Sequence, residues 1–177
     1  MNYVPGDLRD QLAHVGYDVV QSGLVVGSGG NLSARIPDED AIWVTAGGAW
    51  LDRLSRGSFA PVRIVDGEPA TVGALPPSGV EPSSELALHL ALYRARPDVN
   101  AVVHLHPQTA LLLDALGEHI RIVTTDHAFY LRRVSTVPFR NRRSATSSTI
   151  WRTLEWPRTS LSSLPTTWMA AIISASS

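Results

Sequence analysis

Two histidines stand one residue apart at the end of an apolar run, in the stretch AVVHLHP that covers residues 101–107. If this run is a strand, side-chain alternation places His104 and His106 on the same face. Two imidazoles about 7 Å apart along a strand can converge on one cation, and Pro107 would end the strand at an edge where ligand sites of α/β folds form. Ordinary strand histidines fit the same pattern, so the pair alone leaves both interpretations open.

The residue types that are absent narrow the chemistry of any site. The chain has no cysteine, so a transition-metal site must be built from histidine and carboxylate, and cysteine nucleophiles and disulfides are excluded. It also has no lysine, because all fifteen basic residues are arginine. Schiff-base chemistry on a carbonyl substrate needs a lysine amine, so that route to breaking a carbon–carbon bond is closed.

Length and composition predict one globular domain. The chain has 177 residues, of which 44% are hydrophobic, and no stretch approaches the roughly 18 consecutive apolar residues of a membrane helix. The first residues, MNYVPGDLRDQLAHVG, place acids and a proline where a signal peptide has basic and apolar regions. We therefore expect a cytoplasmic protein with no membrane partner.

Helical and strand patterns alternate along the chain. Residues 7–23 carry apolar side chains at helical spacing and end at Gly23, which suits a C-terminal cap. Two short strands near residues 31–36 and 41–45 are bordered by glycine and joined by the acidic turn PDED, as in a β-hairpin with a longer loop. This alternation predicts an α/β fold.

Two glycine-rich turns flank the expected hairpin. GSGGN at residues 27–31 enters the first strand, and AGG at residues 46–48 leaves the second. If the strands pair antiparallel, the two turns meet and expose backbone N–H groups that could hold an anion such as phosphate. Tight turns without a ligand would explain the same glycines.

The stretch EPSSELALHLALYRARP predicts a helix that begins at its serines and ends before Pro97. Ser83 or Ser84 would cap it, and the free N–H groups of a helix start form another anion site. Glu85 in the first turn suits the helix dipole whatever else it does. His89, one turn on, is interpreted as a helix-packing residue rather than a ligand.

The order of GSGGNLSAR, VTAGG and PSSELALHLALYRARPDVNAVVHLHP resembles the class II aldolase family, over about residues 5–138. That family includes L-fuculose-1-phosphate aldolase, sugar-phosphate 4-epimerases and the adducin head domain. The resemblance implies a single-domain, three-layer α/β fold around a central, largely antiparallel β-sheet flanked by helices. It also implies a homotetramer with sites near subunit interfaces, and a divalent metal, usually Zn²⁺, held by three histidines.

The resemblance carries over to individual positions. His104 and His106 match the first two metal ligands, Glu85 matches the acid/base glutamate, and Tyr130 is a candidate proton donor to the aldehyde oxygen. The phosphate-binding positions of the family fall on the glycine-rich and serine-rich turns, at Ser28, Gly30, Asn31, Gly47, Gly48, Ser83 and Ser84. The missing lysine agrees with this, because a class II aldolase uses a metal in place of a Schiff base.

The activity implied is metal-dependent cleavage of a ketose 1-phosphate, similar to L-fuculose 1-phosphate, into dihydroxyacetone phosphate and an aldehyde. A Zn²⁺ ion would stabilise the resulting enediolate as a Lewis acid. Glu85 would move the proton on the nucleophilic carbon, which calls for a pKa nearer neutrality than that of a free glutamate. Two alternatives stay open, a sugar-phosphate 4-epimerase and a catalytically impaired, adducin-head-like member that lacks the third metal ligand.

Residues 139–177 depart from the family pattern and form an atypical tail after a domain of residues 1–138. The family's third histidine comes from a His-His-Gly type motif, yet no histidine follows His127. The tail is rich in Ser, Thr and Arg, lacks glycine and holds three of the five tryptophans. We interpret it as a frame-shifted or truncated end, which the other reading frames after Phe139 would test. With this tail we expect weak metal binding, the third ligand being His127 or a water.

The charge of the tail raises a separate possibility. It contains five arginines and one glutamate, and a basic tail can contact nucleic acid. Neither an aromatic platform nor a recognisable helix accompanies these charges, so we predict no nucleic-acid partner and a small-molecule sugar phosphate as the substrate.

Overall fold

The computed structural model describes residues 6–73, 79–118, 120–126, 128–129 and 169–173. The chain divides into two compact units, Met1–Pro107 with Thr166–Ser174, and Gln108–Pro165 with Ala175–Ser177. Over the described ranges no helix is long and apolar enough to span a membrane. The first unit holds the sheet and the predicted histidine pair.

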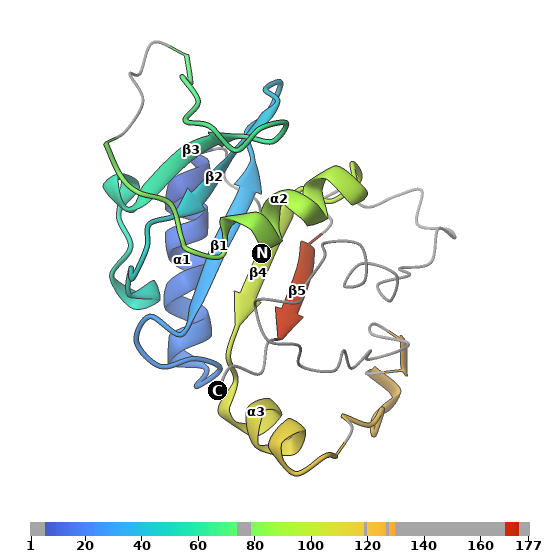
Figure 1. Cartoon of the computed structure of the whole chain (residues 1–177). Coiled ribbons are helices and arrows are strands. Elements are labelled where there is room, and N and C mark those ends of the chain that lie inside the picture. Colours follow the sequence, from blue (N-terminus) through green and yellow to red (C-terminus); the bar gives the residue numbers. More distant parts are fainter. Residues whose placement is uncertain (1–5, 74–78, 119, 127, 130–168, 174–177) are drawn as a thin grey trace. The chain divides into compact units, whose positions relative to one another are not determined.

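The first unit is built on a five-stranded sheet with strand order β3-β2-β1-β4-β5 (Figure 1). The strands are β1 (Gly30–Arg35), β2 (Ala41–Thr45), β3 (Phe59–Arg63), β4 (Ala101–Leu105) and β5 (Met169–Ile173). β1 pairs antiparallel with β2 and β4, β2 pairs antiparallel with β3, and β5 runs parallel to β4. The largely antiparallel α/β sheet and the β1–β2 hairpin are therefore confirmed.

Two helices cover opposite faces of this sheet, which gives three layers (Figure 1). They are α1 (Leu8–Gln21) and α2 (Leu86–Ala95). Alternation along β1 separates the two faces: Leu32 belongs to the apolar core to which α1 contributes Leu12, whereas the side chain of Ser33 contacts His89 of α2. One side of the sheet is therefore an apolar core, and the α2 side carries polar groups.

Helix α1 forms for the reasons that the sequence pattern indicated. Asp7 caps its start by accepting a hydrogen bond from the N–H of Arg9 at 2.9 Å. Its apolar residues pack on the sheet, with Leu12 buried in the core and Val15 and Val19 beside it. The chain leaves the helix at Gly23, whose φ of 70° is a left-handed conformation that glycine adopts without strain.

Two short 3₁₀ turns, η1 (Leu51–Arg53) and η2 (Arg56–Ser58), connect β2 to β3. Arg56 of η2 pairs with Asp10 of α1 at 2.6 Å, which ties this connection to the start of α1. In the second unit, the described residues contain the helix α3 (Gln108–Ala115). The expected domain boundary at residues 138 and 139 lies outside the described residues and stays a prediction.

Candidate metal centre

Strand β4 positions the histidine pair. It lies between β1 and β5 in the sheet, with His104 directly opposite Asn31 of β1. The His104 side chain is 1% exposed. His106 comes just after the last strand residue, where its N–H donates to the carbonyl of Gly29 at 3.0 Å. The two imidazole rings have centroids 4.8 Å apart, so the structure brings them together as the spacing predicted.

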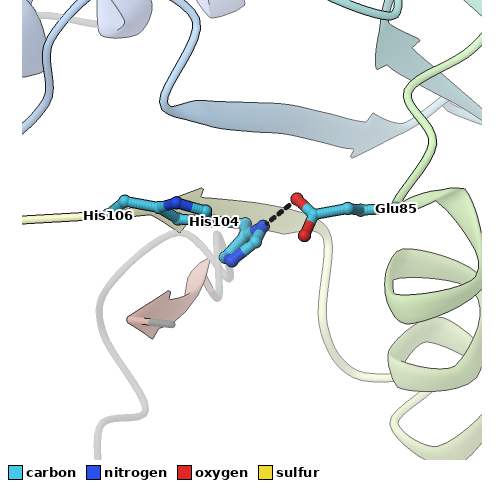
Figure 2. Close-up of side chains that lie close together, drawn as sticks. All are labelled: Glu85, His104 and His106. Atoms are coloured by element: carbon cyan, nitrogen blue, oxygen red, sulfur yellow. Dashed lines mark ion pairs between the residues drawn. The ribbon is translucent and has the colours of Figure 1, made fainter. Parts of the chain in front are cut away.

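Glu85 reaches the same place from the start of α2 (Figure 2). The expectation that Glu85 lies in the first helical turn was wrong by one residue, because α2 begins at Leu86 and Glu85 is its N-cap. The Glu85 side chain makes no capping hydrogen bond. Its Oε2 lies instead 2.7 Å from Nδ1 of His104 and accepts a hydrogen bond from Nδ2 of Asn31 at 2.5 Å. The carboxylate is thus directed away from its own helix and toward the sheet.

The three side chains form a donor set suited to a divalent metal. One ligand atom each from Glu85, His104 and His106 can be chosen so that all lie within 4.8 Å of one another. Within the described residues, Nε2 of His104 is buried and has no hydrogen-bond partner. A buried imidazole nitrogen without a partner is costly, and a metal ion would use its lone pair. Nitrogen and carboxylate oxygen donors together suit Zn²⁺ and neighbouring transition metals.

The electrostatics of Glu85 differ from the expectation. Its contact with His104, followed by the hydrogen bond from Asn31, outweighs the opposing effect of burial and lowers the pKa of Glu85 to about 2. The expected pKa near neutrality is therefore wrong for the metal-free chain. Glu85 is ionised at neutral pH and is in the protonation state that accepts a proton. Loss of either contact would raise its proton affinity.

The glycine-rich turns lie at the same end of the sheet as the histidines. Gly30 pairs with Leu105 at the end of β4, and the N–H of Leu51 donates to the carbonyl of Gly27 at 3.4 Å. The turn after β2 reaches the segment before α2, since Ala46 and Pro82 form a β-bridge. These contacts bring together the three stretches that the sequence analysis assigned to anion binding.

Several of the predicted phosphate-binding groups already have partners within the chain. The N–H of Gly47 donates to the carbonyl of Glu81 at 3.1 Å, and the hydroxyl of Ser83 accepts from the N–H of Glu85 at 3.3 Å. Asn31 is buried and contacts Glu85 and His89. The remaining positions are Ser28, Gly48 and Ser84, which are exposed, and Gly30, which is half-buried.

Two predicted participants lie outside the described residues. These are Tyr130, the candidate proton donor, and His127, the candidate third ligand. The third potential donor that the described residues supply is the Glu85 carboxylate. The predicted roles of all these residues stay predictions.

Sequence reasoning missed the polar residues behind Glu85. His89 is fully buried with Ser33 and Tyr93, where the hydroxyl of Ser33 lies 2.6 Å from Nδ1 of His89 and 2.9 Å from the hydroxyl of Tyr93. Its Nε2 contacts Oδ1 of Asn31. The available signal was the spacing of the polar groups: Asn31 and Ser33 alternate with Leu32 and so share one face of the strand, and His89 and Tyr93 are one helical turn apart.

A three-layer α/β fold with a His-x-His pair and a glutamate at one end of a largely antiparallel sheet defines a class of candidate metal-dependent enzymes. The chain belongs to the class II aldolase and adducin N-terminal domain family, whose family model matches residues 10–161. The fold and the resemblance inferred from the motifs are thereby confirmed.

Relatives within this family have different named activities. The chain is 33% identical over 107 residues to a methylthioribulose-1-phosphate dehydratase of Leptospira interrogans, covering 60% of this chain and 43% of the relative. It is 32% identical over 115 residues to an L-fuculose phosphate aldolase of Methanocaldococcus jannaschii, covering 65% and 58%. It is also 32% identical over 137 residues to a 3-oxo-tetronate 4-phosphate decarboxylase of Escherichia coli, covering 76% and 60%.

A solved L-fuculose-1-phosphate aldolase from Thermus thermophilus superposes with a TM-score of 0.54 at 26% identity, over 71% of this chain and 59% of that one. The chain spans 43% to 60% of the length of the three curated relatives named above. Their named activities are all lyase activities on sugar-derived phosphates.

Proposed function

We propose that the chain is a divalent-metal-dependent lyase that cleaves a ketose 1-phosphate similar to L-fuculose 1-phosphate into dihydroxyacetone phosphate and an aldehyde. The observation that carries this proposal is the cluster of Glu85, His104 and His106 at the glycine-rich end of the sheet. Family membership supports it, and so does the absence of lysine, because the Schiff-base alternative is closed.

His104 and His106 would hold the metal, which we propose to be Zn²⁺, and the Glu85 carboxylate would lie beside it. Bound there, the ion would act as a Lewis acid for the negative charge that develops on the substrate oxygens. His104 is well suited to this role because its ring is fixed: Nδ1 faces Glu85 at 2.7 Å, which leaves the buried Nε2 for the ion.

Glu85 would transfer the proton at the reacting carbon. Its side chain is 25% exposed while that of His104 is 1% exposed, so Glu85 is the member of the pair that a substrate can reach. At neutral pH it is an acceptor, and weakening its contact with His104 would strengthen it as a base. The proton taken up would then be available for return to a carbon or oxygen of the product.

The phosphate would bind at the turns beside this cluster. Ser28, Gly48 and Ser84 are exposed, and Gly48 has a φ of 69°, with nothing within 4 Å of the place where a Cβ would be. Open backbone of this kind lets an anion approach N–H groups closely. Tyr130 as proton donor, assembly as a homotetramer and a cytoplasmic location are further parts of this proposal.

A second candidate activity is decarboxylation of a 3-oxo sugar-acid phosphate. Two decarboxylase relatives are 32% and 36% identical over 76% of the chain, whereas an aldolase relative that aligns over 75% of the chain is 29% identical. Both reactions break a carbon–carbon bond next to a carbonyl group and leave the electron pair on carbon, so the same cluster could serve either.

The test is a product assay on the full chain after chelation and reloading with Zn²⁺, Mn²⁺ or Co²⁺. L-Fuculose 1-phosphate and 5-deoxypentulose phosphates should release dihydroxyacetone phosphate, whereas a 3-oxo-tetronate 4-phosphate would release carbon dioxide and methylthioribulose 1-phosphate would lose water. Glu85→Gln should lower kcat by about 100- to 10,000-fold, because glutamine cannot carry the proton. Glu81→Gln, an exposed glutamate four residues earlier, is the matched control.

The assay contradicts the aldolase proposal if no dihydroxyacetone phosphate forms or if its release survives chelation. Release of carbon dioxide alone would favour the decarboxylase instead.

A further inference from the structure

A continuous run of buried polar side chains leads from the middle of α2 to the Glu85 carboxylate. The hydroxyl of Tyr93 contacts that of Ser33 at 2.9 Å, and Ser33 contacts Nδ1 of His89 at 2.6 Å. Nε2 of His89 contacts Oδ1 of Asn31, and Nδ2 of Asn31 donates to Glu85 at 2.5 Å. The four residues behind Glu85 are all at most 6% exposed. They form one hydrogen-bonded chain shielded from water.

The orientation of the Asn31 amide sets the direction of the bonds in this chain. Its Nδ2 donates to Glu85, so its carbonyl oxygen is the atom that faces His89. His89 must then carry its proton on Nε2 and accept at Nδ1. The hydroxyl of Ser33 is the donor to that nitrogen. Burial lowers the pKa of His89 to about 3, so the ring is neutral and has only one N–H to place.

His89 supports one of the two orientations of the Asn31 amide, from the side opposite Glu85. The oxygen and the NH₂ group of a primary amide have nearly the same size, so packing alone does not choose between them. A donor on the His89 side requires the oxygen there, and the NH₂ group is then directed toward Glu85. Without that donor the amide loses one of the two hydrogen bonds that hold it, so its NH₂ group is less firmly positioned against Glu85.

We propose that His89 is a positioning residue for Glu85, which it orients through the side-chain amide of Asn31. This inference rests on the proposed function, in which Glu85 carries the proton. It assigns His89 a role beyond the helix packing that its place in the sequence indicated. His89 touches Asn31 and Ser33 rather than the metal-binding cluster itself, so its effect on turnover is indirect.

The test compares two substitutions of His89 with a substitution of its buried neighbour. His89→Leu removes the donor to Asn31, whereas His89→Gln keeps an N–H donor close to the position of Nε2. Leu90→Val is the matched control, because Leu90 is 5% exposed on the same helix and lies outside the hydrogen-bonded chain. Steady-state kinetics on the metal-loaded full chain would be combined with ¹⁵N NMR of the Asn31 side-chain amide and of the His89 ring in the metal-free chain.

We expect His89→Leu to lower kcat by about 10- to 100-fold with a much smaller change in KM, as loss of a supporting hydrogen bond does around metal sites. His89→Gln should recover most of the loss, and Leu90→Val should retain kcat. The Asn31 amide signals should be alike in the wild-type and His89→Gln chains and move toward those of a free amide in His89→Leu. The wild-type ring should carry its proton on Nε2.

The proposal is overturned if His89→Leu changes kcat and the Asn31 signals no more than Leu90→Val does, or if the wild-type proton is on Nδ1. If the His89→Leu chain does not fold, the proposal is tested by the position of the proton on the wild-type His89 ring and by the Asn31 amide signals of the His89→Gln chain. A wild-type chain that turns over none of the phosphates contradicts the proposed function alone. In that case the Asn31 signals still report whether His89 orients the amide.

Discussion

At the scale of single residues, the charge of the Glu85 carboxylate depends on the contacts of one of its oxygens. Oε2 is 2.7 Å from His104 and 2.5 Å from Asn31, and these two contacts keep the group ionised. A histidine pair with a glutamate nearby could be predicted from residue types and from the order of the motifs. The link from Asn31 to Glu85 could not, because it joins residues 54 positions apart. The pKa expectation failed mainly because the sequence does not show that the Glu85 carboxylate contacts His104 directly, which is the largest cause of its lowered pKa.

The buried His89 predicts a pH dependence of stability. Burial lowers its pKa from 6.5 to about 3. Between pH 6.5 and pH 3 the unfolded chain therefore binds a proton at this residue and the folded chain does not. Stability should therefore fall as the pH decreases from 6.5 toward 3, by about 1.4 kcal/mol for each pH unit from this residue. Urea unfolding of the wild-type and His89→Gln chains at about pH 7.5 and about pH 4.5 measures this loss of stability. The two conditions lie on either side of the ordinary histidine pKa of 6.5.

The wild-type chain should lose about 3 kcal/mol more than the His89→Gln chain between these two conditions. Carboxylates that titrate in this range contribute equally to both chains and cancel in the comparison. Equal losses would mean that His89 takes up its proton in the folded state as easily as in the unfolded state.

At the scale of elements, the contact between β1 and β4 is what places Asn31 against the histidine pair. The two strands approach closely at Gly30, where an added Cβ would lie 2.6 Å from the carbonyl oxygen of His104. No side chain fits there unless β1 moves away from β4. Asn31 is the next residue, so such a movement would also displace the hydrogen bond to Glu85.

Gly30→Ala should therefore destabilise the chain by about 1–3 kcal/mol, the usual range for overpacking, and lower turnover as well. Gly57→Ala in η2 is the control, because the nearest atom to its added Cβ is a serine oxygen at 3.9 Å. Thermal unfolding and the product assay on both variants check the prediction. A Gly30→Ala chain as stable and active as the Gly57→Ala chain would show that β1 can shift without cost.

Most of the elements near the site could be predicted from local pattern. Helix α1, the β1–β2 hairpin and the start of α2 were located to within a residue or two because caps, glycines and apolar periodicity are local signals. Strand β3 was not predicted, and it contains Pro61. Proline is tolerated there because β3 is an edge strand of the sheet, which only the assembled topology reveals.

At the scale of the whole molecule, metal binding and folding should be coupled. The donors come from β4, the residue after it and the start of α2, and they meet only when the first unit is folded. A ligand that binds the folded chain alone stabilises it by about 2.7 kcal/mol at about 100 times its Kd. For a chain of this size we expect Zn²⁺ to raise Tm by about 5–10 °C at that concentration, and chelation to reverse the shift.

The His104→Gln/His106→Gln chain provides the control for this prediction, since it lacks both imidazoles. A rise in Tm of the same size in that variant would mean that Zn²⁺ binds elsewhere. The concentration of Zn²⁺ at half-maximal shift also tests the expectation of weak binding. The family could be predicted from the order of motifs over the body of the chain, whereas the third histidine ligand could not, because no histidine follows His127.

The amide of Asn31 has a consequence for hydrogen isotopes. An amide keeps its N–H protons at neutral pH, so the chain behind Glu85 orients the carboxylate but delivers no proton to it. A proton on Glu85 therefore enters and leaves through the exposed side of the carboxylate, the side that a substrate would cover. In deuterated water, cleavage should therefore place one deuterium on the carbon of dihydroxyacetone phosphate that Glu85 protonates, delivered from that exposed side.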